Sequence, residues 1–96
     1  MNIKRYIAFV LHFIQLLLTL MDKSWMNKKH GTREYVLGVN EFLSFASKSV
    51  GSDGRICCPC VKCVNYKRYN IRTVYDHVVQ YGMSTGYNQW FAHGEL

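Results

Sequence analysis

Apolar residues recur at every third or fourth position between Thr32 and Lys48, and charged or small polar residues separate them. The recurring positions are Tyr35, Val36, Val39, Phe42, Leu43 and Ala46. Because this spacing puts them on one face, it predicts an amphipathic helix over 32–48 that packs on a core. Thr32 is suited to cap the helix N-terminus, and the two glycines of VGSDG are expected to end the helix.

A second, shorter helix is predicted in the segment NIRTVYDHVVQYG, over 70–82. The apolar residues that share one face of it are Ile71, Val74, Val78 and Tyr81. Gly82 is a typical C-terminal stop. Between the two helices, the segments GRICCPC and CVNYKRY predict a short hairpin.

The tail GYNQWFAHGEL carries three aromatic residues, Tyr87, Trp90 and Phe91. Together with Trp25, they are expected to cover the core rather than to bind a ligand. The pattern as a whole predicts a small, mainly helical α+β fold. In this fold, two amphipathic helices surround a Cys-rich turn or short hairpin.

The first twenty residues differ from the rest. Lys4 and Arg5 precede a run over 7–20 in which only three residues are polar, as in a secretory signal or anchor. The run is short for a membrane span, which needs about 20 apolar residues, and no A-x-A cleavage pattern follows it. We favour a hydrophobic leader outside a domain of residues 21–96. A signal or anchor, and a helix packed on the domain, are the alternatives.

Charge adds a candidate partner to this fold. The chain has 96 residues and a formal net charge of +6, so it is one domain at most and is basic. The segment 55–72 holds five positive residues and no acidic one. This predicts binding to a polyanion such as DNA, and an ordinary solvated face is the alternative. The residues expected to contact DNA are Lys62, Lys67, Arg68 and Arg72.

All four cysteines lie in one stretch, RICCPCVKC, over 55–63. Disulfides are disfavoured, because cysteines this close in sequence reach bridging geometry only with strain and no distant cysteine exists to pair with. A redox C-x-x-C motif is disfavoured because it needs a βαβ context, which this chain lacks.

A structural zinc site fits the spacing better. Cys60 and Cys63 are two residues apart, as on a metal-binding turn, and thirteen residues separate Cys63 from His77. The predicted ligands are Cys58, Cys60, Cys63 and His77. Zinc would then staple the turn between the helices and stabilise a core too small to be secure alone.

Spacing alone leaves two alternative ligands open. Cys57 could replace Cys58, and His93 could replace one of the four ligands. In either case protein side chains fill all four positions. No position then remains for the water or substrate that a catalytic zinc requires.

Five segments of the chain follow one another in a familiar order. They are MDKSWM (21–26), EYVLGVNEFLSFA (34–46), ICCPCVKCVN (56–65), VYDHVVQYGM (74–83) and GYNQWFAHGE (86–95). Together they resemble the plant transposase-associated domain, found near the start of proteins from CACTA-type (En/Spm-like) DNA transposons. The resemblance covers residues 21–96 and not the first twenty.

The family pattern carries C-P-C-x-x-C and two histidines. Its matches in this sequence are Cys58, Pro59, Cys60, Cys63, His77 and His93. Cys57 is an addition to the pattern, which favours Cys58 as the ligand.

The resemblance implies a context more than an activity. It implies a non-catalytic accessory module of a plant transposon protein that acts in the nucleus and binds DNA. The six acidic residues show no arrangement typical of a strand-transfer site, and no small-molecule substrate is expected. The alternative is a module that joins transposase subunits or host proteins through its aromatic tail. A membrane or secretory location would follow only if residues 1–20 act as a signal or anchor.

Overall fold

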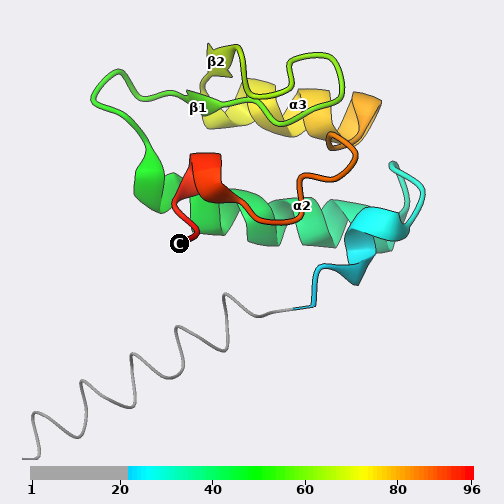
Figure 1. Ribbon diagram of the computed structural model, residues 1–96. Coiled ribbons are helices and arrows are strands. Elements are labelled where there is room, and N and C mark those ends of the chain that lie inside the picture. Colours follow the sequence, from blue (N-terminus) through cyan, green and yellow to red (C-terminus); the bar gives the residue numbers. More distant parts are fainter. Residues whose placement is uncertain (1–21) are drawn as a thin grey trace, which may run out of the picture.

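The computed structural model describes residues 22–96, so the predicted leader lies outside the described residues. The elements are η1 (Ser24–Asn27), α2 (Arg33–Ala46), η2 (Ser47–Ser49), β1 (Ile56–Cys57), β2 (Arg68–Tyr69), α3 (Ile71–Tyr81) and η3 (Phe91–His93). Helices α2 and α3 run in opposite directions in two layers, and the β1–β2 hairpin lies on the α3 side (Figure 1). The predicted fold class, small, mainly helical and α+β, is confirmed.

Helix α2 begins and ends close to its predicted limits. The Thr32 hydroxyl accepts a hydrogen bond from the Tyr35 N–H at 3.3 Å and so caps the first turn. The last turn tightens into η2 instead of continuing as α-helix to Lys48. The predicted apolar face of α2 is buried apart from the partly exposed Val36, and Gly38 is buried in addition. The buried residues of α2 are Tyr35, Gly38, Val39, Phe42, Leu43 and Ala46.

Helix α3 packs its apolar face against α2. The Asn70 side chain accepts from the Thr73 N–H at 2.8 Å, and this bond caps the N-terminus. Val74 and Val78 are fully buried between the layers. The helix ends at Gly82, whose φ of 87° is a conformation that L residues rarely adopt.

The hairpin between the helices is minimal. Ile56 pairs with Tyr69 and Cys57 with Arg68, in antiparallel register. A two-stranded hairpin of this size is marginal on its own in water, so other contacts must hold it in place.

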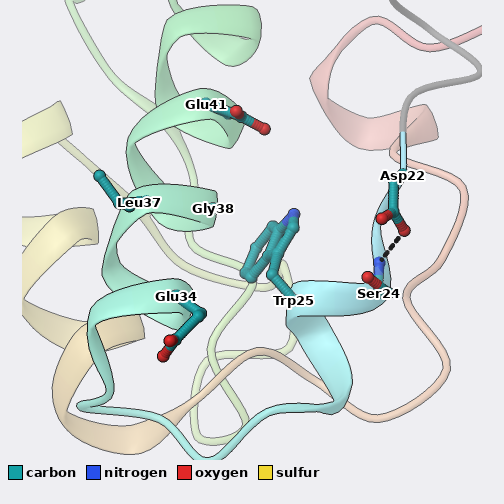
Figure 2. A pocket seen from close by; sticks show the side chains of 7 residues that line it. All are labelled: Asp22, Ser24, Trp25, Glu34, Leu37, Gly38 and Glu41. Atoms are coloured by element: carbon teal, nitrogen blue, oxygen red, sulfur yellow. Dashed lines mark hydrogen bonds between the residues drawn. The ribbon is translucent and has the colours of Figure 1, made fainter.

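A close contact between Trp25 and Gly38 joins η1 to α2 (Figure 2). The indole ring lies directly against the Gly38 backbone, where any Cβ would overlap its atoms. Trp25 also meets Tyr35 edge to face, with ring centroids 5.2 Å apart. Glycine in the middle of a helix is normally unfavourable, and here it makes room for one of the two tryptophans of the core.

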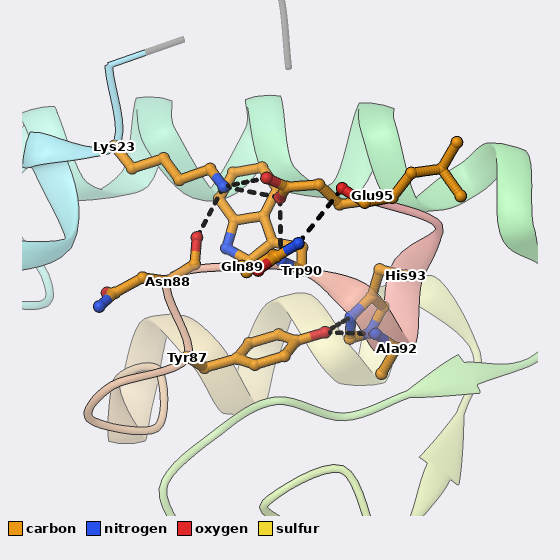
Figure 3. A network of polar contacts seen from close by, with 9 residues as sticks. Lys23, Tyr87, Asn88, Gln89, Trp90, Ala92, His93 and Glu95 are labelled. Carbon is orange, nitrogen blue, oxygen red and sulfur yellow. Dashed lines mark hydrogen bonds and ion pairs between the residues drawn. The ribbon is translucent and has the colours of Figure 1, made fainter. Parts of the chain in front are cut away.

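The segment after α3 returns along α2 and ends beside η2, where the Ser49 hydroxyl donates to the His93 carbonyl at 3.0 Å (Figure 1). Trp90 packs edge to face on Phe42 at 5.0 Å. Lys23 forms a part-buried ion pair with Glu95 at 2.6 Å, and the Glu95 carboxylate also accepts from the Trp90 N–H at 2.9 Å (Figure 3). The expectation that Trp25, Tyr87 and Trp90 cover the core is confirmed, whereas for Phe91 it is wrong, because 69% of that side chain is exposed.

We expect Gly38→Ala to destabilise the protein by about 1–3 kcal/mol, because the added methyl group displaces Trp25 from its contact. This outcome runs against helix propensity, which favours alanine by about 1 kcal/mol. Urea denaturation followed by tryptophan fluorescence measures the change. Ser44→Ala is the matched control, because Ser44 is exposed on the same helix. A Gly38→Ala protein as stable as the control would show that the contact does not constrain the fold.

Candidate metal centre

Three thiols and one imidazole converge at one point beside α3. The ligand atoms of Cys58, Cys60, Cys63 and His77 all lie within 4.8 Å of one another. His77 Nδ1 lies 3.6, 3.9 and 3.5 Å from the three sulfur atoms, in that order. A tetrahedral zinc ion with ordinary bond lengths places its sulfur and nitrogen ligands about 3.5 Å apart. The donor atoms and their separations therefore fit a four-coordinate metal ion.

Backbone hydrogen bonds shape the loop that carries the thiols. The Val64 N–H donates to the Cys60 carbonyl at 2.8 Å, and the Cys63 N–H lies 3.3 Å from the Cys60 sulfur. The Cys58 N–H donates to the Lys67 carbonyl at 2.8 Å, and this bond extends the hairpin ladder. The loop therefore places three sulfur atoms on one side without regular secondary structure.

Further bonds fix this loop to the end of α3. The Val61 N–H donates to the Gly82 carbonyl at 2.9 Å. Ser84 donates its N–H to the Pro59 carbonyl at 2.8 Å and its hydroxyl to the Cys60 carbonyl at 3.1 Å. Because α3 carries His77, these bonds set the distance between the imidazole and the thiols.

Two tyrosines enclose the His77 ring. The ring meets Tyr69 of β2 edge to face at 5.1 Å and Tyr81 at 5.6 Å. The sequence pattern did not single out either tyrosine in this role. The one available signal was the i, i+4 spacing of His77 and Tyr81 on α3, which places them on the same helix face.

The thiols differ in how readily they ionise. Burial raises the pKa of Cys58 and of Cys63. Burial acts in the same direction on Cys60, but hydrogen bonds from the N–H groups of Cys63 and Lys62 to its sulfur lower its pKa. Metals bind thiolates, so an ion bound here would release protons from the thiols.

The two alternative ligands lie outside this cluster. His93 is 1% exposed, and its Nε2–H donates to the Cys57 carbonyl at 2.7 Å. Its Nδ1 accepts from the Tyr87 hydroxyl at 2.6 Å (Figure 3). One ring nitrogen thus links the tail to β1, and the other forms a hydrogen bond within the tail. The Cys57 thiol is half-buried and is not part of the group of four.

The four basic residues predicted to contact DNA lie on the hairpin, its loop and α3, and they differ in their partners. Arg68 pairs with Asp53 at 3.1 Å and donates to the Arg55 carbonyl. Arg72 makes a surface pair with Asp76 at 3.6 Å. The Lys62 ammonium lies 4.0 Å from the centre of the Tyr81 ring. Lys62 forms no ion pair with an acidic side chain among residues 22–96.

Lys67 follows the cysteine loop, and its side chain is exposed. It makes no ion pair with another residue of the described part of the chain. Of the four residues predicted to contact DNA, Lys62 and Lys67 are therefore the two that no acidic side chain of residues 22–96 pairs with.

Comparisons with known proteins place this geometry in a family context. The family model for the transposase-associated domain matches residues 23–95. The matched range includes the four clustered side chains, both helices and the hairpin. Neither the curated proteins nor the solved structures gave a match. Among residues 22–96, no helix has the length and apolar character needed to cross a membrane.

We expect the buried His93 to make the folded state sensitive to acid. Burial lowers the pKa of His93 below its ordinary value. The unfolded chain, with a histidine pKa of about 6.5, then binds more protons than the folded one. The contribution of His93 to the free energy of unfolding should be fully present above about pH 6.5. It should be lost as the pH falls below that value. Urea denaturation across pH 5–8 measures this decrease.

His93→Gln is the control for this pH dependence, because glutamine retains a donor for the Cys57 carbonyl and does not titrate. All other titratable groups are the same in both proteins, so the difference between the two pH profiles isolates His93. Parallel profiles would show that His93 titrates as it does in the unfolded chain.

Proposed function

Because the chain belongs to the transposase-associated domain family, we propose that it is a zinc-stabilised, non-catalytic accessory module of a plant DNA transposon protein. It acts in the nucleus and binds DNA through the basic segment around the cysteine loop. The observation that carries this proposal is the closed group formed by His77 and three cysteines that lie within that basic segment.

Zinc is the metal that suits these donors best. Three thiolates and one imidazole are soft and borderline ligands, and tetrahedral sites of this composition are typical of structural zinc. The three thiols are buried, so solvent has little access to the point where they converge. Bound there, zinc would contribute folding free energy and would leave no open position for a substrate.

The charge distribution supports DNA as the partner. Lys62 and Lys67 flank the loop and are not neutralised by acidic residues of 22–96. Lysines of this kind contact phosphates, which gives affinity more than sequence choice. The three carboxylates that make no ion pair within the described residues are elsewhere, along a groove formed by η1 and α2 (Figure 2): Asp22, Glu34 and Glu41.

The exposure of Phe91 favours a second candidate function. Phe91 is 69% exposed and lines a groove with Tyr66, which is 92% exposed, and exposed apolar side chains grouped in this way are typical of a contact surface. The alternative is therefore a protein–protein interaction module that joins transposase subunits or host proteins.

Two adjacent cysteines provide a sharp test of the metal centre. We expect the wild-type chain and Cys57→Ser to bind one zinc ion each, because the Cys57 thiol lies outside the group of four. Cys58→Ser and His77→Ala should lose the ion and much of the folded structure, since each removes one of four ligands. Native mass spectrometry counts the zinc, and circular dichroism follows folding before and after chelation. Equal zinc content in Cys57→Ser and Cys58→Ser would contradict this ligand set.

The salt dependence of DNA binding tests the lysines. We expect Lys62→Gln/Lys67→Gln to bind duplex DNA more weakly than wild type. The slope of log affinity against log salt should be smaller by about 0.9 for each phosphate that a lysine no longer neutralises. Lys48 is an exposed lysine in η2, so Lys48→Gln is the matched control and should retain the wild-type slope. Equal slopes in all three proteins would exclude this surface as the DNA-binding face.

A further inference from the structure

A shallow groove lies beside the cysteine loop, between that loop and the tail. Its volume is about 460 Å³. One wall comes from the turn after Cys63, and the other comes from the segment between α3 and η3. We call it the aromatic groove, and the lining residues that matter here are Val64, Tyr66, Ser84, Thr85, Tyr87 and Phe91.

The groove gathers large apolar side chains that the core does not use. Tyr66 is 92% exposed, Phe91 is 69% exposed and Val64 is 49% exposed. Single exposed apolar residues are ordinary, but several that line one groove mark an interaction site. Phe91 is also held in position, because it meets the buried Tyr87 ring edge to face at 5.4 Å.

The backbone that presents Tyr66 is strained. Val64 and Asn65 both have positive φ, of 48° and 63°. A β-branched residue in this region is a rare outlier, and such strain persists where the surrounding structure enforces it. Here the Val64 N–H is bound to the Cys60 carbonyl and the Asn65 N–H to the Cys58 carbonyl, both at 2.8 Å. The cysteine loop thus holds an unfavourable turn that directs an aromatic residue into solvent.

The charges around the groove indicate what it binds. The side chains that line it are uncharged, while Lys62 precedes the turn and Lys67 follows Tyr66. Aromatic platforms next to cations are the pattern by which proteins hold single-stranded nucleic acid, with bases on the rings and phosphates on the cations. Bases in a duplex are already stacked on one another, so a duplex cannot offer them to exposed rings.

We propose that the aromatic groove binds unpaired bases of single-stranded DNA, which stack on Tyr66 and Phe91 while Lys62 and Lys67 hold the adjoining phosphates. Thr85 on the opposite wall offers a hydroxyl to the edge of a stacked base. This rests on the proposed function, because it assumes that DNA is the partner. It adds that the module prefers DNA with unpaired bases over an intact duplex.

The test compares two DNA forms with matched variants of the full 96-residue chain. Fluorescence anisotropy gives the affinity for a single-stranded oligothymidine and for a duplex of equal length. For Tyr66→Ala/Phe91→Ala, we expect about ten-fold weaker binding to the single strand and unchanged binding to the duplex. Tyr66→Phe should retain wild-type affinity, since the ring remains. Leu37→Ala is the control, because Leu37 is 52% exposed on α2 and is not among the residues that line the groove.

A spectroscopic measurement reports the stacking directly. One 2-aminopurine base in the single strand should lose fluorescence when wild type or Tyr66→Phe binds, and should lose much less with the double alanine variant. If the double variant bound both DNA forms as wild type does, the inference would be overturned and the groove would be left to a protein partner. If wild type bound neither DNA form, the proposed function itself would fail.

Discussion

The convergence of three thiols on the His77 imidazole is the contact on which the rest of the structure depends. The hairpin has two residues in each strand, and the loop between its strands has no regular structure. Neither could hold its shape alone. What fixes them is attachment to α3 at two points, through His77 within the helix and through Gly82 and Ser84 after it. With the loop fixed in this way, the backbone of residues 55–66 provides an anchor for the tail.

That anchor explains why two adjacent cysteines have different surroundings. Successive side chains along an extended segment point to opposite sides. Cys58 and Cys60 are two residues apart and face the cluster together, whereas the Cys57 thiol is not part of it. The Cys57 carbonyl instead accepts from His93, whose other nitrogen is bound to Tyr87. The tail is thereby joined to the cysteine strand, while its Trp90 packs on α2. One short stretch of chain thus links both layers.

The parts that the sequence predicted are those with local signals. Periodicity located both helices, because burial on one face repeats every three or four residues. Residue spacing predicted the group of four side chains that the structure brings together, but it fitted His93 as well. Only the fold distinguishes the metal-site histidine from the other one. His77 lies on α3 beside the thiols, whereas His93 lies in η3 and is buried away from them. The fit of Trp25 on Gly38 and the exposure of Phe91 depend on contacts between distant segments, which no local pattern encodes.

The strained turn at Val64 connects stability to function. A domain of this size has few apolar residues, and burial of Tyr66 and Phe91 would serve its core better than exposure does. A protein selected for stability alone would also avoid a valine in the left-handed region. The cysteine loop tolerates both costs if a bound metal contributes the free energy that the core lacks. The same ligands that hold the loop then hold Lys62, Tyr66 and Lys67 in register. On this reasoning, metal binding and presentation of the proposed DNA-binding surface are one equilibrium, because that surface exists only while the loop is closed.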